Sequence, residues 1–592
     1  MGHDGYRAED VAKTAGSETG AVQQSRESMS QHAISEAIKA ATSSARTVGS
    51  EDYTNPIRTA TTDTSSAHVP GLMLDNNSDL PKSKMTFVVD LTTDLQLDDG
   101  TVAGAQRAQE QLKQLAEESK GHPGATIVIQ AIDKRPEKSS SDAPANATPA
   151  DAATNATSSD APASAASKTT PMLSRYIIHD GVITPAEKVA SKGMAGDVED
   201  LLKYASQNAP SDSIALAIKS HGDGGAGITG GTGHATLLEV TEAIRSGLKG
   251  SGHDRLDVLD FDSCIMSAPS VLSAVHSAAD HVVASQEPET AGKTFDGQNL
   301  NAALTDLLRN PGMSPVELSK DLVEKANHGA TPEVGQSSHG DTLKHVGADT
   351  LASYESSEFK QFHQAMNELG GLLSKSAQND ESRKAIVDII DKTKRLPTEN
   401  SDPNPYRDGY RDLKDFVSDI KAGAERGTIS DADGSIARAA QNVLDGQSKM
   451  TEAYSGSAIG GYDKLGGLYT FLPVSEVRNG SAAPLQLMAE CATDNNFADK
   501  NDIVHELEQL KTEVTEQVSD STKAQFQPVI DTITKIKEAQ DEGTFQSAMR
   551  GLGETVKALQ GSDVDKELKD HLLKAEDVSG ADQWNEFIRQ VS

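Results

Sequence analysis

Short apolar runs alternate with longer amphipathic segments through the middle of the chain. Runs such as MTFVVDL and ATIVIQAI are rich in β-branched residues, which favours buried strands. The segments between several of these runs carry apolar residues at helical spacing. The pattern predicts strands at 85–91, 125–132, 175–181, 213–225, 256–266 and 280–286, and helices at 102–119, 196–207 and 237–248. Alternating strands and helices predict an α/β fold whose mostly parallel sheet is covered by helices on both faces.

The remaining segments divide the chain further. Residues 1–80 are rich in Ser, Thr and Ala and predict a disordered tail, and residues 136–171 predict a flexible insertion. Residues 350–444 predict helices, 467–474 an isolated strand, and 502–588 amphipathic helices with breaks near 525–528 and 561. We therefore expect a tail (1–80), a catalytic domain (81–335), a helical region with one strand that completes the core (336–480), and a helical C-terminal extension (481–592).

Composition limits the classes of function. The formal charge of −34 argues against binding to nucleic acid or to an anionic membrane surface. No apolar run has the length of a membrane span, and the first residues do not have the pattern of a signal peptide. The two cysteines, Cys264 and Cys491, cannot form a disulfide framework. We therefore expect a cytoplasmic protein, or one exported without a standard signal peptide.

Two predicted strands end in residues that can carry chemistry. One ends in Ser-His-Gly-Asp-Gly-Gly with His221, and the other in Asp-Ser-Cys with Cys264. A single helix separates them, so a parallel crossover would bring both strand ends to the same edge of the sheet. A histidine can take the proton of a thiol near neutral pH, and the N–H of Gly222 could stabilise an oxyanion.

A structural interpretation competes with this catalytic one. A lone cysteine at a strand end is more often a small buried apolar residue than a nucleophile. The adjacent placement of His221 and Cys264 raises the catalytic hypothesis to about even odds with the structural one. Cys491 has no histidine near it in sequence, so we interpret it as structural. A Cys-His zinc site is not predicted, because no second ligand pair has the usual spacing.

The residues around His221 and Cys264 resemble the clostripain-like cysteine peptidases of the caspase-like clan. In that family a strand ends in N/S-H-G-x-G and the next core strand in x-D-A/S-C-x-M; here these segments are SHGDGG and FDSCIM. Further segments resemble the family in the same order along the chain. They are MTFVVDLTTDLQLDD, ATIVIQAIDKR, RYIIHDG, HVVASQEPETAG and GLYTFLPVSE, and the resemblance covers residues 85–476.

The resemblance implies a caspase-like α/β fold and an endopeptidase that cleaves after Arg or Lys. His221 would be the general acid and base, Cys264 the nucleophile, and the N–H groups of Gly222 and Cys264 the oxyanion hole. Asp262 matches the family acid at the floor of the specificity pocket, where a carboxylate would pair with a substrate cation. Glu287 and Glu289 are further candidates for the same pocket. The family also favours a bacterial origin.

The chain departs from the family pattern in three places. Gln286 replaces the first Glu of the usual pair, the Gly-Trp that often follows is absent, and no Lys or Arg lies between His221 and Arg245. Self-processing would therefore use Lys249, with Arg245 and Arg255 as further sites, in an exposed glycine-rich loop. No cofactor is required for this chemistry. Some family members need calcium, with which the acidic composition is compatible, although no EF-hand-like loop is present.

The sequence thus predicts a cysteine endopeptidase that acts on protein or peptide substrates with Arg or Lys at the cleaved bond. The alternative is a catalytically silent adaptor that keeps the peptidase fold and binds a partner through its C-terminal helices. The presence of His221, Cys264 and Asp262 together favours the enzyme, because a silent scaffold has no physical need for all three.

Overall fold

The protein is described by a computed structural model. It describes residues 80–91, 102–133, 171–184, 187–287, 300–326, 335–336, 342–343, 350–394, 409–456, 463–472, 482, 485, 488–489, 492 and 500–591. The predicted tail and the predicted insertion therefore lie almost entirely outside the described residues. All the elements below belong to the unit formed within residues 70–592.

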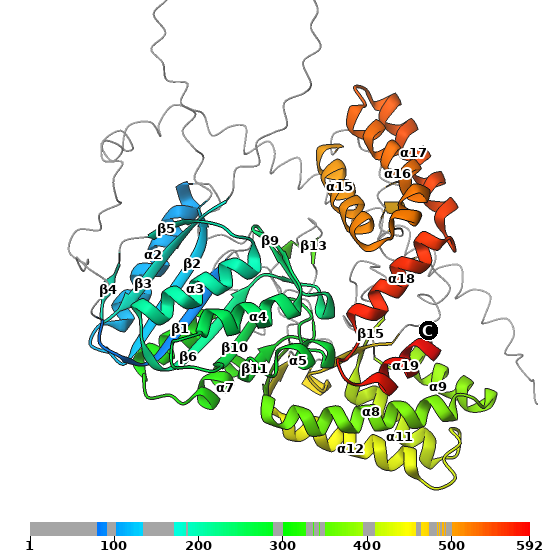
Figure 1. The fold of residues 1–592 in the computed structure, drawn as a ribbon, viewed down its shortest axis with the longest axis horizontal. Coiled ribbons are helices and arrows are strands. Elements are labelled where there is room, and N and C mark those ends of the chain that lie inside the picture. Colours follow the sequence, from blue (N-terminus) through cyan, green and yellow to red (C-terminus); the bar gives the residue numbers. More distant parts are fainter. Residues whose placement is uncertain are drawn as a thin grey trace, which may run out of the picture. The chain divides into compact units, whose positions relative to one another are not determined.

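A ten-stranded mixed sheet forms the centre of this unit, with the order β16-β14-β11-β10-β6-β1-β2-β3-β4 and with β5 paired to β3 (Figure 1). The five central strands run parallel to one another, and β14, β16, β3, β4 and β5 are antiparallel to their neighbours. Their bounds are β1 Ser83–Leu91, β2 Ala125–Asp133, β3 Met172–His179, β4 Val182–Ile183, β5 Glu187–Ala190, β6 Ser211–Lys219, β10 Leu256–Asp262, β11 Ala279–Ala284, β14 Thr350–Glu355 and β16 Thr451–Gly456.

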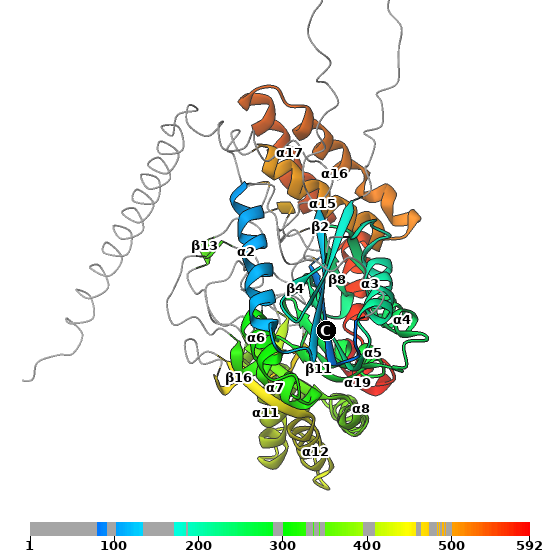
Figure 2. The same cartoon turned by 90° about the vertical axis from the view of Figure 1, so that its left-hand side faces the viewer.

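Helices cover both faces of this sheet, as Figure 2 shows for α2, α6 and α7 on one side and α3, α4 and α5 on the other. Strand β1 is buried at every position but Lys84, as a central parallel strand should be. The first face carries α2 (Val102–Ser119), α6 (Leu300–Arg309) and α7 (Pro315–Lys325). The second carries α3 (Met194–Asn208), α4 (Leu237–Leu248) and α5 (Pro269–Val275), and the apolar core under them continues into α8 (Phe359–Ser376), α9 (Asp380–Lys392), α11 (Leu413–Glu425) and α12 (Ser435–Met450).

The sequence pattern predicted the central layers. The caspase-like α/β architecture is confirmed, and α2 and α4 begin and end at the predicted residues. Three predictions were wrong. Strand β14 opens a region predicted as helical, and the strand at 467–474 is not isolated, because β17 (Tyr469–Phe471) pairs with β15 (Tyr410–Asp412). Pro528 lies inside α16 (Asp520–Glu538) instead of breaking it.

The C-terminal helices separate into two groups. Helices α15 (Lys500–Gln517), α16, α17 (Glu542–Leu559) and α18 (Asp563–Ala575) share an apolar core of their own. The chain then returns, and α19 (Asp582–Val591) packs on α8 within the core of the sheet domain. This approach is close enough that a Cβ on Gly370 would lie 2.4 Å from the Cα of Trp584. The expected boundary near residue 480 stays a prediction, but apolar residues of 578–591 pack in the core of the sheet domain.

Candidate active site

The two chemically distinctive strand ends lie side by side. Strands β6 and β10 are parallel neighbours in a register that places Lys219 opposite Asp262. Beyond this pair, the N–H of Ser220 donates to the carbonyl oxygen of Asp262 over 3.2 Å. The predicted adjacency of the strands that precede His221 and Cys264 is therefore present in the structure.

The loop after β6 is a small sheet of its own. His221–Gly222 form β7, which pairs with β8 (Ile228–Gly230), and β8 pairs with β9 (Gly233–Ala235). The backbone of Gly222 lies against the loop that carries Cys264, since a Cβ at this position would lie 2.0 Å from the carbonyl oxygen of Cys264. Only glycine fits this contact without a shift of the backbone. His221 and Cys264 are both half-buried at this junction.

The loop that carries Cys264 is strained and firmly held. Ile265 has a φ of 48°, which is unusual for a β-branched residue. Its N–H donates to the carbonyl oxygen of Glu287 over 3.1 Å, and the N–H of Ser267 donates to that of Ser285 over 2.8 Å. Strain of this kind is often found at active sites, where the surrounding structure maintains it. The hydrogen bonds to the loop after β11 fix the backbone on the C-terminal side of the thiol.

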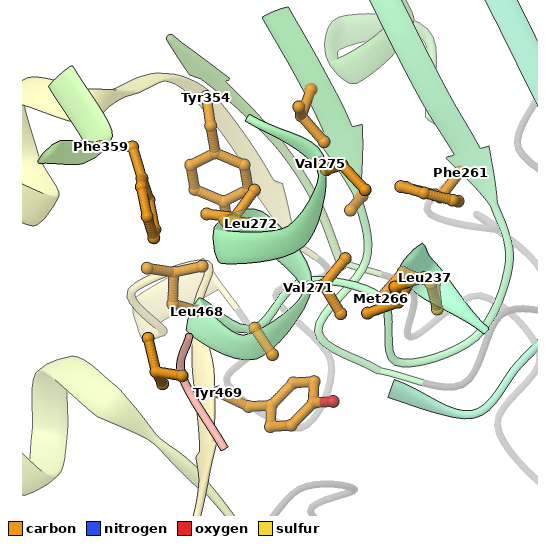
Figure 3. Packing of buried hydrophobic residues seen from close by; sticks show 14 of the residues in the cluster. Leu237, Phe261, Met266, Val271, Leu272, Val275, Tyr354, Phe359, Leu468 and Tyr469 are labelled. Carbon is orange, nitrogen blue, oxygen red and sulfur yellow. The ribbon is translucent and has the colours of Figure 1, made fainter. Parts of the chain in front are cut away.

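Helix α5 follows this loop and anchors it in the core. Figure 3 shows Val271 and Leu272 of α5, with Tyr354 and Leu468 on one side and Phe261 and Met266 on the other. Burial of an apolar side chain of this size stabilises the fold by roughly 1.5–3 kcal/mol. The cysteine loop is therefore held by packing as well as by hydrogen bonds.

Asp262 is engaged in an ion pair that the sequence analysis did not predict. The ammonium of Lys219 lies 2.7 Å from its Oδ2, and the two side chains are only 2% and 3% exposed. Asp260 lies two residues earlier on β10 and is buried. Its carboxyl oxygens have no hydrogen-bond partner among the described residues. Burial, with the charge of Asp262 adding to it, raises the pKa of Asp260 well above its ordinary value. The predicted pocket acid is thus one member of a buried charged group.

The loop after β11 contains the remaining candidates for the specificity pocket, and the structure describes one of them. Glu287 is 1% exposed and lies beside the cysteine loop through its backbone contact with Ile265. Gln286 has a structural position: its amide donates to Asp412 over 3.1 Å and accepts from the N–H of Gly467 over 2.9 Å. Glu289 lies outside the described residues, as does Cys491.

A segment of the C-terminal region also contacts the histidine loop, which the sequence analysis missed. Glu576, at the end of α18, accepts hydrogen bonds from the N–H of Gly225 over 3.3 Å and from the hydroxyl of Ser270 over 3.0 Å. The hydroxyl of Tyr410 donates to the same carboxyl group over 3.4 Å. Burial raises the pKa of Glu576 to about 7, against the opposing effect of these hydrogen bonds. Nothing in the local sequence marked this glutamate.

The predicted self-processing residues lie on α4 and the loop after it. Lys249 is exposed at the C-cap of α4, directly before two glycines with positive φ, Gly250 and Gly252. Arg245 donates to Ser277 over 2.7 Å and pairs with Glu242, and Arg255 pairs with Asp280. Lys249 and Arg245 are exposed and Arg255 is half-buried, and cleavage at Lys249 stays a prediction.

The described residues contain neither a metal-binding cluster nor a membrane-spanning helix. Among these residues, no group of three or more His, Cys, Asp or Glu side chains could hold a metal ion. None of the described helices has both the length and the apolar character needed to cross a membrane.

The sheet, with its parallel centre and its helices on both faces, is the caspase-like architecture of a class of cysteine peptidases. A family model described as the Clostripain family matches residues 109–473, more than half of the chain. The chain belongs to this family. The predicted resemblance is thereby confirmed, and a search of curated proteins gives no match.

Solved structures of the same kind of protein are similar to this chain at low identity. A secreted C11 cysteine protease of Bacteroides thetaiotaomicron is 12% identical, with 67% of this chain and 95% of that chain covered and a TM-score of 0.42. An inactive zymogen C11 protease from Parabacteroides distasonis is 14% identical, with 68% and 95% covered and a TM-score of 0.42.

Proposed function

We propose that this chain is a cysteine endopeptidase in which Cys264 is the nucleophile and His221 is the general acid and base. The observation that supports this most is the contact of Gly222 with the carbonyl of Cys264 at two adjoining strand ends. This contact requires the residues that carry the imidazole and the thiol to lie on facing segments. The strained φ of Ile265, directly after the cysteine, adds support from the backbone.

The reaction follows from the two side chains. His221 takes the thiol proton, and the sulfur attacks the carbonyl carbon of the scissile bond to give a tetrahedral oxyanion. The N–H groups of Gly222 and Cys264 would donate to that oxyanion. His221 then gives its proton to the leaving amine, which departs and leaves a thioester. Water hydrolyses the thioester after His221 removes one of its protons, and the thiol is restored.

The proposed preference is for Arg or Lys before the cleaved bond. Asp262 is the last residue of β10, two residues before Cys264, and Glu287 lies beside the cysteine loop. Acidic side chains in a desolvated pocket favour a guanidinium or ammonium group. Self-processing after Lys249 would separate His221 from Cys264 in the chain, while the β6–β10 pairing would hold the fragments together.

The direct test is cleavage of fluorogenic peptides that end in Arg, Lys or Asp, in calcium and in EDTA. We expect release after Arg and Lys, loss of activity in Cys264→Ala, and nearly unchanged activity in Cys491→Ala. The calcium arm tests the proposed compatibility with this ion. Equal activity of Cys264→Ala and the parent would remove the thiol mechanism, and absence of activity in both would favour the adaptor hypothesis.

Self-processing is tested separately by N-terminal sequencing of aged protein. We expect a new N-terminus at Gly250 in the parent and none in Cys264→Ala. A fully active chain that stays uncut would show that maturation at this loop is not part of the mechanism. The cellular location, cytoplasmic or exported without a standard signal peptide, stays a prediction.

A further inference from the structure

The buried ion pair beside the nucleophile has a feature that the proposed specificity does not explain. A pocket acid that selects basic substrates should offer its charge to the substrate. Here the carboxylate of Asp262 already holds the ammonium of Lys219, at 2.7 Å and with both side chains almost fully buried. The chain itself therefore supplies the cation that Asp262 was expected to receive from a substrate.

The position of Lys219 makes this arrangement a property of the fold. Lys219 lies two residues before His221, Asp262 lies two residues before Cys264, and the two are register partners on neighbouring strands. Neither side chain can leave the pair without disturbing a strand that leads directly into the reacting residues. Because Asp262 is the proposed pocket acid, the ammonium lies beside the place where the residue before the scissile bond is proposed to bind.

Asp260 does not change the balance of charge in this group. It is 1% exposed, and its oxygens have no hydrogen-bond partner among the described residues, which is the environment of a neutral carboxylic acid. Burial accordingly raises its pKa. The ammonium of Lys219 and the carboxylate of Asp262 lie 2.7 Å apart, so a cation that approaches Asp262 meets a dipole instead of a bare carboxylate.

We infer that Lys219 is a specificity-determining residue, an internal cation that neutralises Asp262 and keeps the preference for basic substrates weak. This inference rests on the proposed function, because it concerns the substrate pocket of the same site. Two cations would compete for one carboxylate. The ammonium of Lys219 repels a substrate guanidinium that approaches Asp262, and the guanidinium must share the carboxylate with that ammonium. Removing the positive charge converts Asp262 into a strong receptor for Arg and Lys.

Arginine and citrulline substrates provide the matched probe, since they have nearly the same shape and differ in charge. A bare buried carboxylate should prefer arginine by more than about a hundredfold, the size of effect expected when a buried pair lacks one partner. With Lys219 present, we expect the parent chain to prefer arginine by less than about a hundredfold in kcat/KM. Lys219→Gln, which keeps a hydrogen-bond donor, should raise this ratio by about tenfold or more.

Two further variants serve as controls. Lys219→Arg keeps the charge and should leave the ratio near that of the parent, and Lys219→Gln combined with Asp262→Asn should bring it close to one. A parent that prefers arginine by more than about a hundredfold overturns the inference, even if Lys219→Gln does not fold. So does an active Lys219→Gln enzyme with the parent ratio. If the parent cleaves neither peptide, it is the proposed function that fails.

Discussion

Two buried carboxyl groups near the histidine and cysteine loops have different partners: one has a cation and the other has neutral donors. Asp262, on the central strand β10, holds a lysine ammonium at 2.7 Å. Glu576, which reaches the histidine loop from the end of α18, accepts only from a backbone N–H and hydroxyl groups. The strand-end carboxyl lies against an opposite charge, whereas burial among neutral groups raises the pKa of the C-terminal carboxyl to about 7.

This difference predicts different responses to mutation and to pH. A buried ion pair is sensitive to loss of one partner, because the other charge remains without compensation. A carboxyl group among neutral donors is sensitive to pH, because its ionised form is disfavoured in the folded state. We therefore expect substitution to lower stability most at the Lys219–Asp262 pair. Rising pH should lower stability most at the contact between Glu576 and the histidine loop.

The largest expected effect is on the ion pair. Asp262→Asn leaves the Lys219 ammonium buried without its carboxylate and should lower the free energy of unfolding by about 3–5 kcal/mol. Urea unfolding at neutral pH measures this change. Combining Asp262→Asn with Lys219→Met removes both charges and should recover most of the loss. A single variant as stable as the parent would show that the pair has no such sensitivity.

The next effect concerns Glu576, whose pKa is about 7 in the folded protein. Above about pH 4.5 the unfolded chain releases a proton that the folded chain retains. The free energy of unfolding should therefore fall by up to about 3 kcal/mol as the pH rises from about 4.5 to about 7, and this contribution should stay constant above pH 7.

Glu576→Gln should remove this contribution, which urea titrations at pH 5 and pH 7.5 would measure. Glu586→Gln is a matched control, because Glu586 is exposed on the nearby helix α19. The same pH dependence in the parent and in Glu576→Gln would mean that this carboxyl does not contribute to it.

The smallest effect concerns the C-terminal core, away from both carboxyls. Pro528 lies inside α16, where it removes one backbone hydrogen bond. Pro528→Ala should stabilise this helical group by up to about 3 kcal/mol, the cost of an interior proline, with the hydroxyl of Thr532 still bonded to the carbonyl of residue 528. Thermal unfolding measures the gain. Peptide cleavage should not change, and a large change would connect this core to the active site.

The local pattern of apolar residues was sufficient to predict the strands that lead to His221 and Cys264. The run before His221 and the run before Cys264 are apolar and separated by one amphipathic helix, so a parallel crossover followed from short-range features. The family resemblance then assigned roles to His221 and Cys264. The edge strands were harder, because β14 and β16 combine few apolar residues with pairings to segments far away in the chain.

Long-range contacts explain what the sequence analysis missed at the site. The Lys219–Asp262 pair depends on the register of two strands, which the pattern of apolar residues does not reveal by itself, although a lysine within the run IALAIK was a visible anomaly. Glu576 contacts a loop about 350 residues earlier in the chain, and no local motif accompanies it.

Covalent trapping tests the proposed Cys264–His221 chemistry most directly. A biotinylated peptide with arginine before a thiol-reactive ketone is added to the full chain, and the labelled residue is mapped by mass spectrometry. The account predicts a single adduct on Cys264, formed at least about a hundredfold more slowly in His221→Ala, the usual size of a lost general base. An adduct on Cys491, or labelling of Cys264 at the same rate without His221, would contradict it.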